Sequence, residues 1–151
     1  MRISVQPMDT SAASGRSVRV LLAEDDADGL EVLATALRRV GFEVETVADG
    51  GRLLVALAAH YRPGSAGRPP DLIVTDVIMP VCSGLSIFEA LRAAHWRTPV
   101  IVISAVDSPA VRSSTAFLGA TFMRKPIDLD TFVRTAQRLI SAANDDVAPQ
   151  V

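Results

Sequence analysis

The fold of this chain is decided by the stretch Pro69-Pro-Asp-Leu-Ile-Val-Thr-Asp-Val-Ile-Met-Pro80. Its apolar run from Leu72 to Thr75 predicts a strand that is covered on both faces, as the strands of parallel sheets are. The flanking prolines prevent a helix from running into this strand and prevent the strand from continuing. Asp76 follows the run directly. Because ligands of open α/β sheets bind outside the carboxyl ends of the strands, Asp76 lies where a functional residue is expected.

Length and composition predict one globular domain in the cytoplasm. The chain has 151 residues, 49% of them hydrophobic, which is enough to bury a sizeable core. Its net charge of −2 gives no reason to expect direct binding of nucleic acid or of a membrane surface. The single cysteine excludes an internal disulfide, and no apolar run approaches the roughly 20 residues of a membrane helix. Residues 1–17 also lack the apolar segment of a secretory signal.

Strands and helices are expected to alternate along the chain. Apolar or alternating segments predict strands at 18–23, 42–47, 72–75, 99–103 and 121–124. Helical spacing and capping residues predict a helix after each strand, at 30–40, 53–58, 84–91, after a cap at Asp107 or Ser108, and at 128–140. Strict alternation predicts an α/β fold: a doubly wound, five-stranded parallel sheet in the flavodoxin-like order 2-1-3-4-5, with five helices in a three-layer α/β/α arrangement.

The domain is expected to span residues 18–144. It is preceded by a disordered arm at 1–17 and followed by a short tail at 145–151. The Pro/Gly-rich segment 60–70 is expected to be a mobile loop, to which the sequence assigns no function. We expect His60 and His95 at the surface, Trp96 partly exposed, and Cys82 to be an ordinary small apolar residue near Asp76.

Polar residues follow four of the predicted strands. They are Glu24 and Asp25 after the first strand, Asp76 after the third, Ser104 after the fourth and Lys125 after the fifth. In a parallel sheet these side chains converge on one edge, where three carboxylates are stable mainly with a cation. Oxygen ligands favour Mg²⁺, with Mn²⁺ as an alternative, and a lysine and a hydroxyl beside the metal suit a transferring phosphoryl group. The pattern therefore predicts phosphoryl chemistry with an aspartate nucleophile.

Each of these residues alone has an ordinary structural explanation. The acids after the first strand suit a helix start, Asp76 suits a turn, Ser104 suits a helix cap, and an isolated lysine is usually solvated. Their joint placement at strand ends favours the functional explanation over these separate ones.

At this point the sequence resembles the receiver domains of two-component response regulators. The resemblance covers residue 18 to about residue 144. It rests on four stretches in this order: Val20-Leu-Leu-Ala-Glu-Asp-Asp26, Asp71-Leu-Ile-Val-Thr-Asp-Val-Ile-Met-Pro80 with Gly84, Val100-Ile-Val-Ile-Ser-Ala105, and Lys125-Pro126. Each stretch alone is weakly specific, whereas all four at this spacing make a specific signal. No position that the family requires is missing.

The resemblance assigns the phosphoacceptor and the metal ligands. Asp76 would accept a phosphoryl group from a phosphohistidine of a histidine kinase or a histidine phosphotransfer protein. Glu24, Asp25 and Asp76 would bind Mg²⁺, together with the backbone carbonyl of Ile78. Glu24 stands where the family more often has aspartate, which moves the carboxylate outward by one methylene group.

The resemblance also assigns the residues of a conformational switch. Ser104 would bind the new phosphoryl group, and Lys125 would form an ion pair with it. Lys125-Pro126 would be a cis peptide bond. Phe122 occupies the aromatic switch position and would fill the space that Ser104 leaves, although as phenylalanine it has no hydroxyl group.

The implied output is an altered surface, formed by the fourth helix, fifth strand and fifth helix. A downstream protein or a second copy of the chain would bind there, since the few residues after the last helix leave no room for an output domain. Ile78 and Val106 follow Asp76 and Ser104 by two positions, and their apolar side chains orient water poorly. We therefore expect slow self-dephosphorylation and not enzymatic turnover.

Two other functions are compatible with parts of the pattern. A phosphohydrolase with an aspartyl nucleophile would need a second acid two residues after Asp76, where the chain has Ile78. A flavodoxin-like nucleotide binder would need a glycine-rich phosphate loop, where the chain has three acids. The sequence could also be a piece of a longer hybrid kinase. The partner kinase, the pathway and the oligomeric state are not legible from the sequence.

Overall fold

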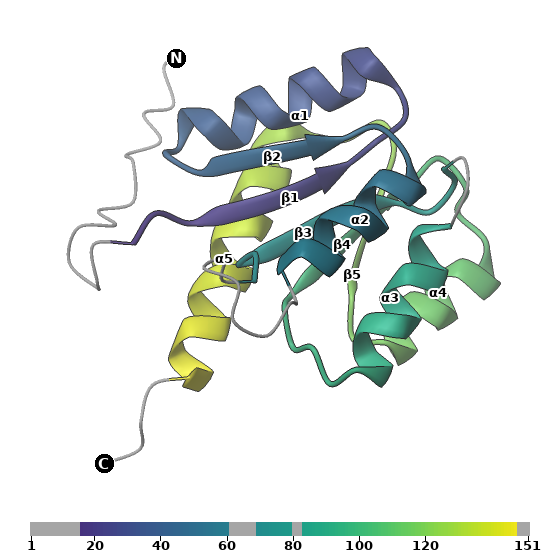
Figure 1. The fold of residues 1–151 in the computed structure, drawn as a ribbon. Coiled ribbons are helices and arrows are strands. Elements are labelled where there is room, and N and C mark those ends of the chain that lie inside the picture. Colours follow the sequence, from purple (N-terminus) through teal and green to yellow (C-terminus); the bar gives the residue numbers. More distant parts are fainter. Residues whose placement is uncertain (1–15, 61–68, 80–82, 148–151) are drawn as a thin grey trace.

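The structure is a computed structural model that describes residues 16–60, 69–79 and 83–147. Within them the elements run β1 (Arg19–Ala23), α1 (Ala27–Arg39), β2 (Glu43–Val47), α2 (Gly50–His60), β3 (Leu72–Asp76), α3 (Gly84–Ala93), β4 (Val100–Ser104), α4 (Pro109–Phe117), β5 (Thr121–Arg124) and α5 (Leu129–Val147). The strands form one sheet in the order β2-β1-β3-β4-β5, and each neighbouring pair is parallel (Figure 1). The predicted strand order is confirmed.

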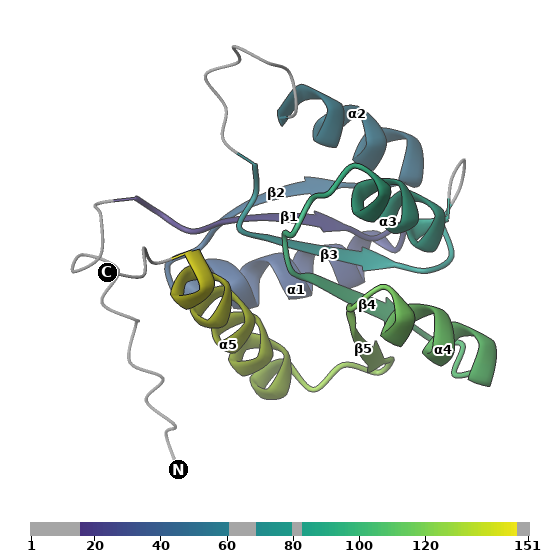
Figure 2. The same cartoon turned by 90° about the horizontal axis from the view of Figure 1, so that it is seen from below.

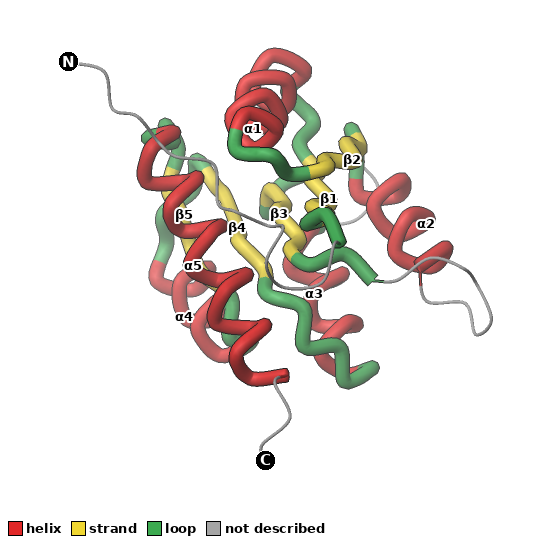
Figure 3. The backbone as a smooth tube through the Cα atoms, turned by 90° about the vertical axis from the view of Figure 1, so that its left-hand side faces the viewer, coloured by secondary structure: helices red, strands yellow, loops and turns green. Residues whose placement is uncertain are grey.

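Helices cover both faces of the sheet, which makes three layers (Figures 2 and 3). One core cluster joins the sheet to α1 and α5, and the other joins it to α2 and α3. Side chains of a strand alternate between these clusters: Val20 and Leu22 of β1 belong to the first, and Leu21 and Ala23 to the second. Every residue of β3 and β4 is buried, which explains their unbroken apolar runs.

Capping residues fix three of the helix starts: α3 and α4 begin where the sequence predicts them, whereas α1 begins at Ala27, three residues before the predicted start. Asp26 accepts a hydrogen bond from the backbone N–H of Gly29 at 2.9 Å and caps α1. Ser83 caps α3, and Ser108 caps α4 immediately before Pro109. These caps fix where the chain turns after β1, β3 and β4, and therefore which residues lie at the carboxyl edge of the sheet.

Two predictions about single residues need correction. Trp96 is only 8% exposed and belongs to the second core cluster. The chain leaves α3 through His95 in the left-handed region (φ 63°), and Arg92 donates to the carbonyl of Trp96 at 2.6 Å, so the indole turns into the core. His60 is the last residue of α2, and its side chain is 12% exposed with Nε2 3.2 Å from Glu45.

Several other predictions fall outside the described residues. These concern most of the N-terminal arm, most of the segment 60–70, Cys82 and the end of the C-terminal tail. In the part of the chain that the structure describes, no helix combines the length and the apolar character needed to cross a membrane.

Gly84 allows α3 to begin directly against the end of β3. A Cβ atom at this position would lie 2.2 Å from the carbonyl oxygen of Asp76 and 2.7 Å from Thr75 Oγ1. Because the first of these atoms is backbone, α3 would have to move. Gly84→Ala is therefore expected to lower the free energy of unfolding by about 1–3 kcal/mol in urea denaturation.

Gly29→Ala is the matched control for this prediction. The nearest atoms to its added Cβ belong to the Asp26 side chain, whose capping oxygen would lie at 2.9 Å; a side-chain oxygen can shift more easily than backbone, and alanine favours helix. Its stability should stay within about 1 kcal/mol of the wild type. Equal losses in the two variants would contradict the role given to Gly84.

Candidate functional site

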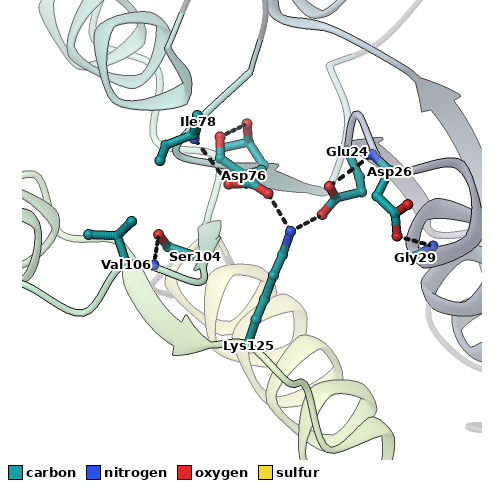
Figure 4. A network of polar contacts seen from close by, with 9 residues as sticks. Glu24, Asp26, Gly29, Asp76, Ile78, Ser104, Val106 and Lys125 are labelled. Carbon is teal, nitrogen blue, oxygen red and sulfur yellow. Dashed lines mark hydrogen bonds and ion pairs between the residues drawn. The ribbon is translucent and has the colours of Figure 1, made fainter.

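Asp76 is the last residue of β3, and two donors hold its carboxylate. One oxygen accepts a hydrogen bond from the backbone N–H of Ile78 at 3.0 Å. The other accepts from Lys125 Nζ at 2.5 Å (Figure 4). Asp76 is only 5% exposed, so these donors replace much of the solvation that a free carboxylate has in water.

Two further carboxylates lie beside Asp76. Glu24 follows β1, is 1% exposed, and accepts a hydrogen bond from the backbone N–H of Asp26 at 3.1 Å. Asp25 is exposed. One ligand oxygen from each of Glu24, Asp25 and Asp76 lies within 4.8 Å of the others. Three oxygen donors with one side open to solvent fit a hard divalent cation such as Mg²⁺, which keeps several waters.

Lys125 connects two of these acids. Its ammonium lies 2.8 Å from Glu24 Oε2 and 2.5 Å from Asp76 Oδ2, and Figure 4 shows it between the two carboxylates. The backbone N–H of Lys125 donates to the carbonyl of Ser104 at 2.9 Å, and the bond from Lys125 to Pro126 is cis, as expected. The end of β5 is thereby fixed to the end of β4, with the side chain directed at the acids.

Burial and pairing shift the pKa values of Glu24 and Lys125. Burial is the main cause that raises the pKa of the Glu24 carboxyl above its ordinary value; the charge of Asp76 adds to it, and the hydrogen bonds from Lys125 and Asp26 and the charge of Lys125 offset only part of the rise. Burial lowers the pKa of the Lys125 ammonium, but the hydrogen bonds to Asp76 and Glu24 and the negative charges of these two acids together outweigh burial, so this pKa is raised. The lysine therefore stays charged, while the buried glutamate gains from any added positive charge.

Ser104 and two exposed apolar residues complete the surroundings of Asp76. Ser104 is fully buried, and its hydroxyl accepts a hydrogen bond from the backbone N–H of Val106 at 2.9 Å. Ile78 is 61% exposed and Val106 41%. Both residues follow the strand ends by two positions, where an exposed apolar side chain could shield a group on Asp76 from water.

The family follows from a comparison with known sequences. A sequence model described as the response regulator receiver domain matches residues 20–137. This range includes the three acids of the site, Ser104 and Lys125. The chain belongs to this family.

Curated relatives of this receiver domain are similar over most of its length. The transcriptional regulatory protein PrrA of Mycobacterium tuberculosis is 39% identical over 134 residues, which are 88% of this chain and 53% of PrrA. The alkaline phosphatase synthesis transcriptional regulatory protein SphR of Synechococcus elongatus is 29% identical over 148 residues, 97% of this chain and 56% of SphR. The chain thus spans about half the length of the curated relatives it matches.

Solved structures agree in fold. The receiver domain of the Francisella response regulator 1452 superimposes with a TM-score of 0.73 at 26% identity, covering 84% of this chain and 99% of that one. The chemotaxis protein CheY4 of Vibrio cholerae gives a TM-score of 0.68 at 30% identity, covering 82% of this chain and 99% of that one. Receiver domains bind Mg²⁺ through an acidic pocket, and this chain has the acidic group that could hold the ion.

The receiver domain brings most of the predicted site residues into direct contact. Glu24, Asp76 and Lys125 are bonded to one another, and Asp25 lies within reach of the same ion. Ser104 lies next to this group through its backbone bond to Lys125, while its hydroxyl bonds to the following loop. The roles that the sequence assigns to these residues stay predictions.

Phe122 has a partner that sequence reasoning missed. It lies opposite Val102 in the register of β4 and β5 and is half-buried. The guanidinium of Arg112, from α4, lies over its ring at 5.1 Å from the centroid. Arg112 also bonds to the carboxylate of Asp107. A helical arginine ten residues before an aromatic residue is no recognisable motif, so only the structure shows the pair.

The raised pKa of Glu24 predicts how stability depends on pH. Since the folded-state pKa lies above the unfolded value, stability is fully present below the unfolded pKa and is lost as pH rises through the folded pKa. Glu24→Gln, which cannot ionise, should therefore gain stability relative to the wild type as pH rises from about 4.5 toward neutral. Urea denaturation in EDTA across this range measures the difference. Glu89→Gln, at an exposed position, should keep the wild-type profile, and parallel profiles for all three proteins would contradict the prediction.

Proposed function

We propose that this receiver domain accepts a phosphoryl group on Asp76 from a phosphohistidine, supplied by a sensor histidine kinase or a histidine phosphotransfer protein of a two-component system. The observation that carries the proposal is the position of the Asp76 carboxylate at the end of β3, where it pairs with the Lys125 ammonium and could bind one cation together with Glu24 and Asp25. Few other reactions need a buried carboxylate nucleophile, a lysine and a divalent-cation site together.

The transfer exchanges one bond to phosphorus for another. An oxygen of Asp76 forms an O–P bond as the P–N bond of phosphohistidine breaks, and the electron pair of that bond returns to the imidazole nitrogen. The Asp76 oxygen that would attack is the one that Lys125 now contacts. The Ile78 N–H orients the carboxylate through the other oxygen.

Glu24, Asp25, Asp76 and the backbone carbonyl of Ile78 would hold Mg²⁺, or Mn²⁺ in its place. When bound, the ion supplies positive charge close to the transferred oxygens. Lys125 would leave its contact with Asp76 and pair with the phosphoryl group, and the Ser104 hydroxyl would donate to another of its oxygens. A backbone hydrogen bond from Lys125 to Ser104 already holds the two residues side by side.

We propose slow loss of the phosphoryl group and no enzymatic turnover. Ile78 and Val106 lie at the mouth of the site and offer no polar atom beyond the backbone to orient an attacking water. The phosphoryl group adds about −1.5 to −2 charges and three acceptor oxygens, which is a large local change that persists for the lifetime of the adduct.

The signal would leave through the α4-β5-α5 face. Ser104 would move toward the phosphoryl group, and Phe122 would turn into the space behind it. A downstream protein, or a second copy of the chain, would bind the altered face, without direct contact to nucleic acid or membrane and in the cytoplasm. The names of PrrA and SphR as transcriptional regulatory proteins support a regulatory output for proteins that contain such a domain.

Intact mass spectrometry with acetyl phosphate tests the proposal. The protein should gain one phosphoryl group in the presence of Mg²⁺, none in EDTA, and should lose the adduct in hydroxylamine, which cleaves acyl phosphates. No adduct under conditions where the folded protein binds Mg²⁺ would overturn the proposal. Release of many equivalents of phosphate per chain would favour a phosphohydrolase instead.

A further inference from the structure

Arg112 is fixed between the loop after β4 and the ring of Phe122. Its guanidinium donates two hydrogen bonds to the carboxylate of Asp107, from Nε to one oxygen and from Nη2 to the other, the latter at 2.9 Å. The same group covers the Phe122 ring at 5.1 Å from the centroid. A bidentate pair holds the plane of the guanidinium, so the position of Asp107 determines whether the ring is covered.

Asp107 is connected in turn to Ser104. The Ser104 hydroxyl accepts a hydrogen bond from the N–H of Val106, the residue before Asp107 (Figure 4). On the other side, Ser108 caps α4 and its carbonyl accepts from the N–H of Arg112 at 3.1 Å. Asp107 thus lies between a residue bonded to Ser104 and the first residues of the helix that carries Arg112.

We propose that Arg112 is a positioning residue that, with Asp107, latches Phe122 against α4 in the unphosphorylated receiver domain. The proposal rests on the function proposed above. Phenylalanine has no hydroxyl with which to bond in either state, so its outer position needs another source of stabilisation. The cation over its ring supplies this, and Phe122 belongs to neither of the two core clusters of the described residues.

Phosphorylation would release the latch. Once the Ser104 hydroxyl is drawn toward a phosphoryl oxygen, the N–H of Val106 follows or loses its acceptor, and Asp107 moves with it. Arg124 lies 3.8 Å from Asp107 and can stay paired with it when Arg112 does not. Phe122 then loses its cover and is free to turn inward.

A contact that is made in only one of two conformations shifts the equilibrium toward that conformation. Removing the latch should therefore favour the phosphorylated conformation and raise the affinity for beryllofluoride, which mimics a phosphoryl group on an aspartate. For an exposed cation–π contact and an exposed ion pair, an increase of about three- to tenfold is expected in Arg112→Gln. Asp107→Asn should act in the same direction.

The test is a beryllofluoride titration of the full chain in Mg²⁺, followed by amide NMR. Arg97→Gln is the matched control, because it removes the same positive charge. Arg97 is exposed and precedes β4, so it lies at the amino ends of the strands, away from the site at their carboxyl ends. Arg112→Gln is also combined with Phe122→Leu. If Arg112 acts through the ring, its effect should largely disappear in that background.

Three results would count against the latch. Equal affinities of the wild type and Arg112→Gln would overturn the latch alone, and so would a full effect of Arg112→Gln in the Phe122→Leu background. Failure of the wild type to bind beryllofluoride would overturn the proposed function, and the latch with it. A rise in affinity for Arg112→Gln that Arg97→Gln lacks and Phe122→Leu abolishes would establish it.

Discussion

Asp76→Asn is expected to abolish the phosphoryl adduct formed with acetyl phosphate. The amide of asparagine is a poor nucleophile. In the wild type, Ile78 N–H holds one oxygen of Asp76 and Lys125 holds the other, an arrangement that Glu24 and Asp25 do not share. The protein should remain folded, because the amide oxygen can still accept one of these two hydrogen bonds. Intact mass spectrometry measures the adduct, and circular dichroism measures the fold.

Asp28→Asn provides the control for this prediction. Asp28 is an exposed acid in the first turn of α1, so its loss changes the net charge equally and leaves the site intact. This variant should be phosphorylated like the wild type. An adduct of wild-type yield on Asp76→Asn would place the nucleophile elsewhere, with Glu24 and Asp25 as the nearest candidates.

The edge of the sheet that carries this chemistry is predictable because it follows from backbone periodicity. A doubly buried strand shows as an unbroken apolar run, and parallel strands end together, so Asp76 and Ser104 must meet at one edge. Helix caps such as Ser108 are short-range signals of the same kind. These features depend on neighbours in the sequence, which a single sequence displays directly.

Contacts between side chains that are far apart in the sequence leave no such local pattern. Trp96 is buried because His95 adopts a positive φ and Arg92 binds the following carbonyls, which no apolar pattern reveals. The pair of Arg112 and Phe122 depends on how α4 packs beside β5, and exposed charges carry no periodic signal. The residues that the sequence singles out at the strand ends lie together in the structure, their roles stay predictions, and their partners on neighbouring elements come from the structure.

Lys125→Met is expected to change two properties of the site in opposite directions. The ammonium now occupies hydrogen-bonding positions of both Glu24 and Asp76, so it competes with a metal ion for the same oxygens. Without it, the affinity for Mg²⁺ should rise by about tenfold or more. In EDTA, two buried carboxylates lose their counter-ion, and the free energy of unfolding should fall by about 2–4 kcal/mol.

Calorimetric titration with Mg²⁺ and urea denaturation with and without the ion measure the two effects. Competition between Lys125 and Mg²⁺ can be measured directly in the wild-type protein, because Lys125 is its only lysine. Selective ¹³C labelling of lysine gives a single Cε signal, which should move as Mg²⁺ is added, if the ion displaces the ammonium from the carboxylates. A signal that stays fixed through saturation would show that lysine and ion do not share these oxygens.

Lys125→Arg separates charge from geometry. Its guanidinium keeps the positive charge, so the stability in EDTA should stay closer to the wild type than that of Lys125→Met, and the affinity for Mg²⁺ should not rise. If both variants bound Mg²⁺ more tightly, the size of the side chain and not its charge would govern the site. If only Lys125→Met did so, the resting ion pair restrains metal binding, and the same ammonium is available for a phosphoryl group once the ion has replaced it at Glu24 and Asp76.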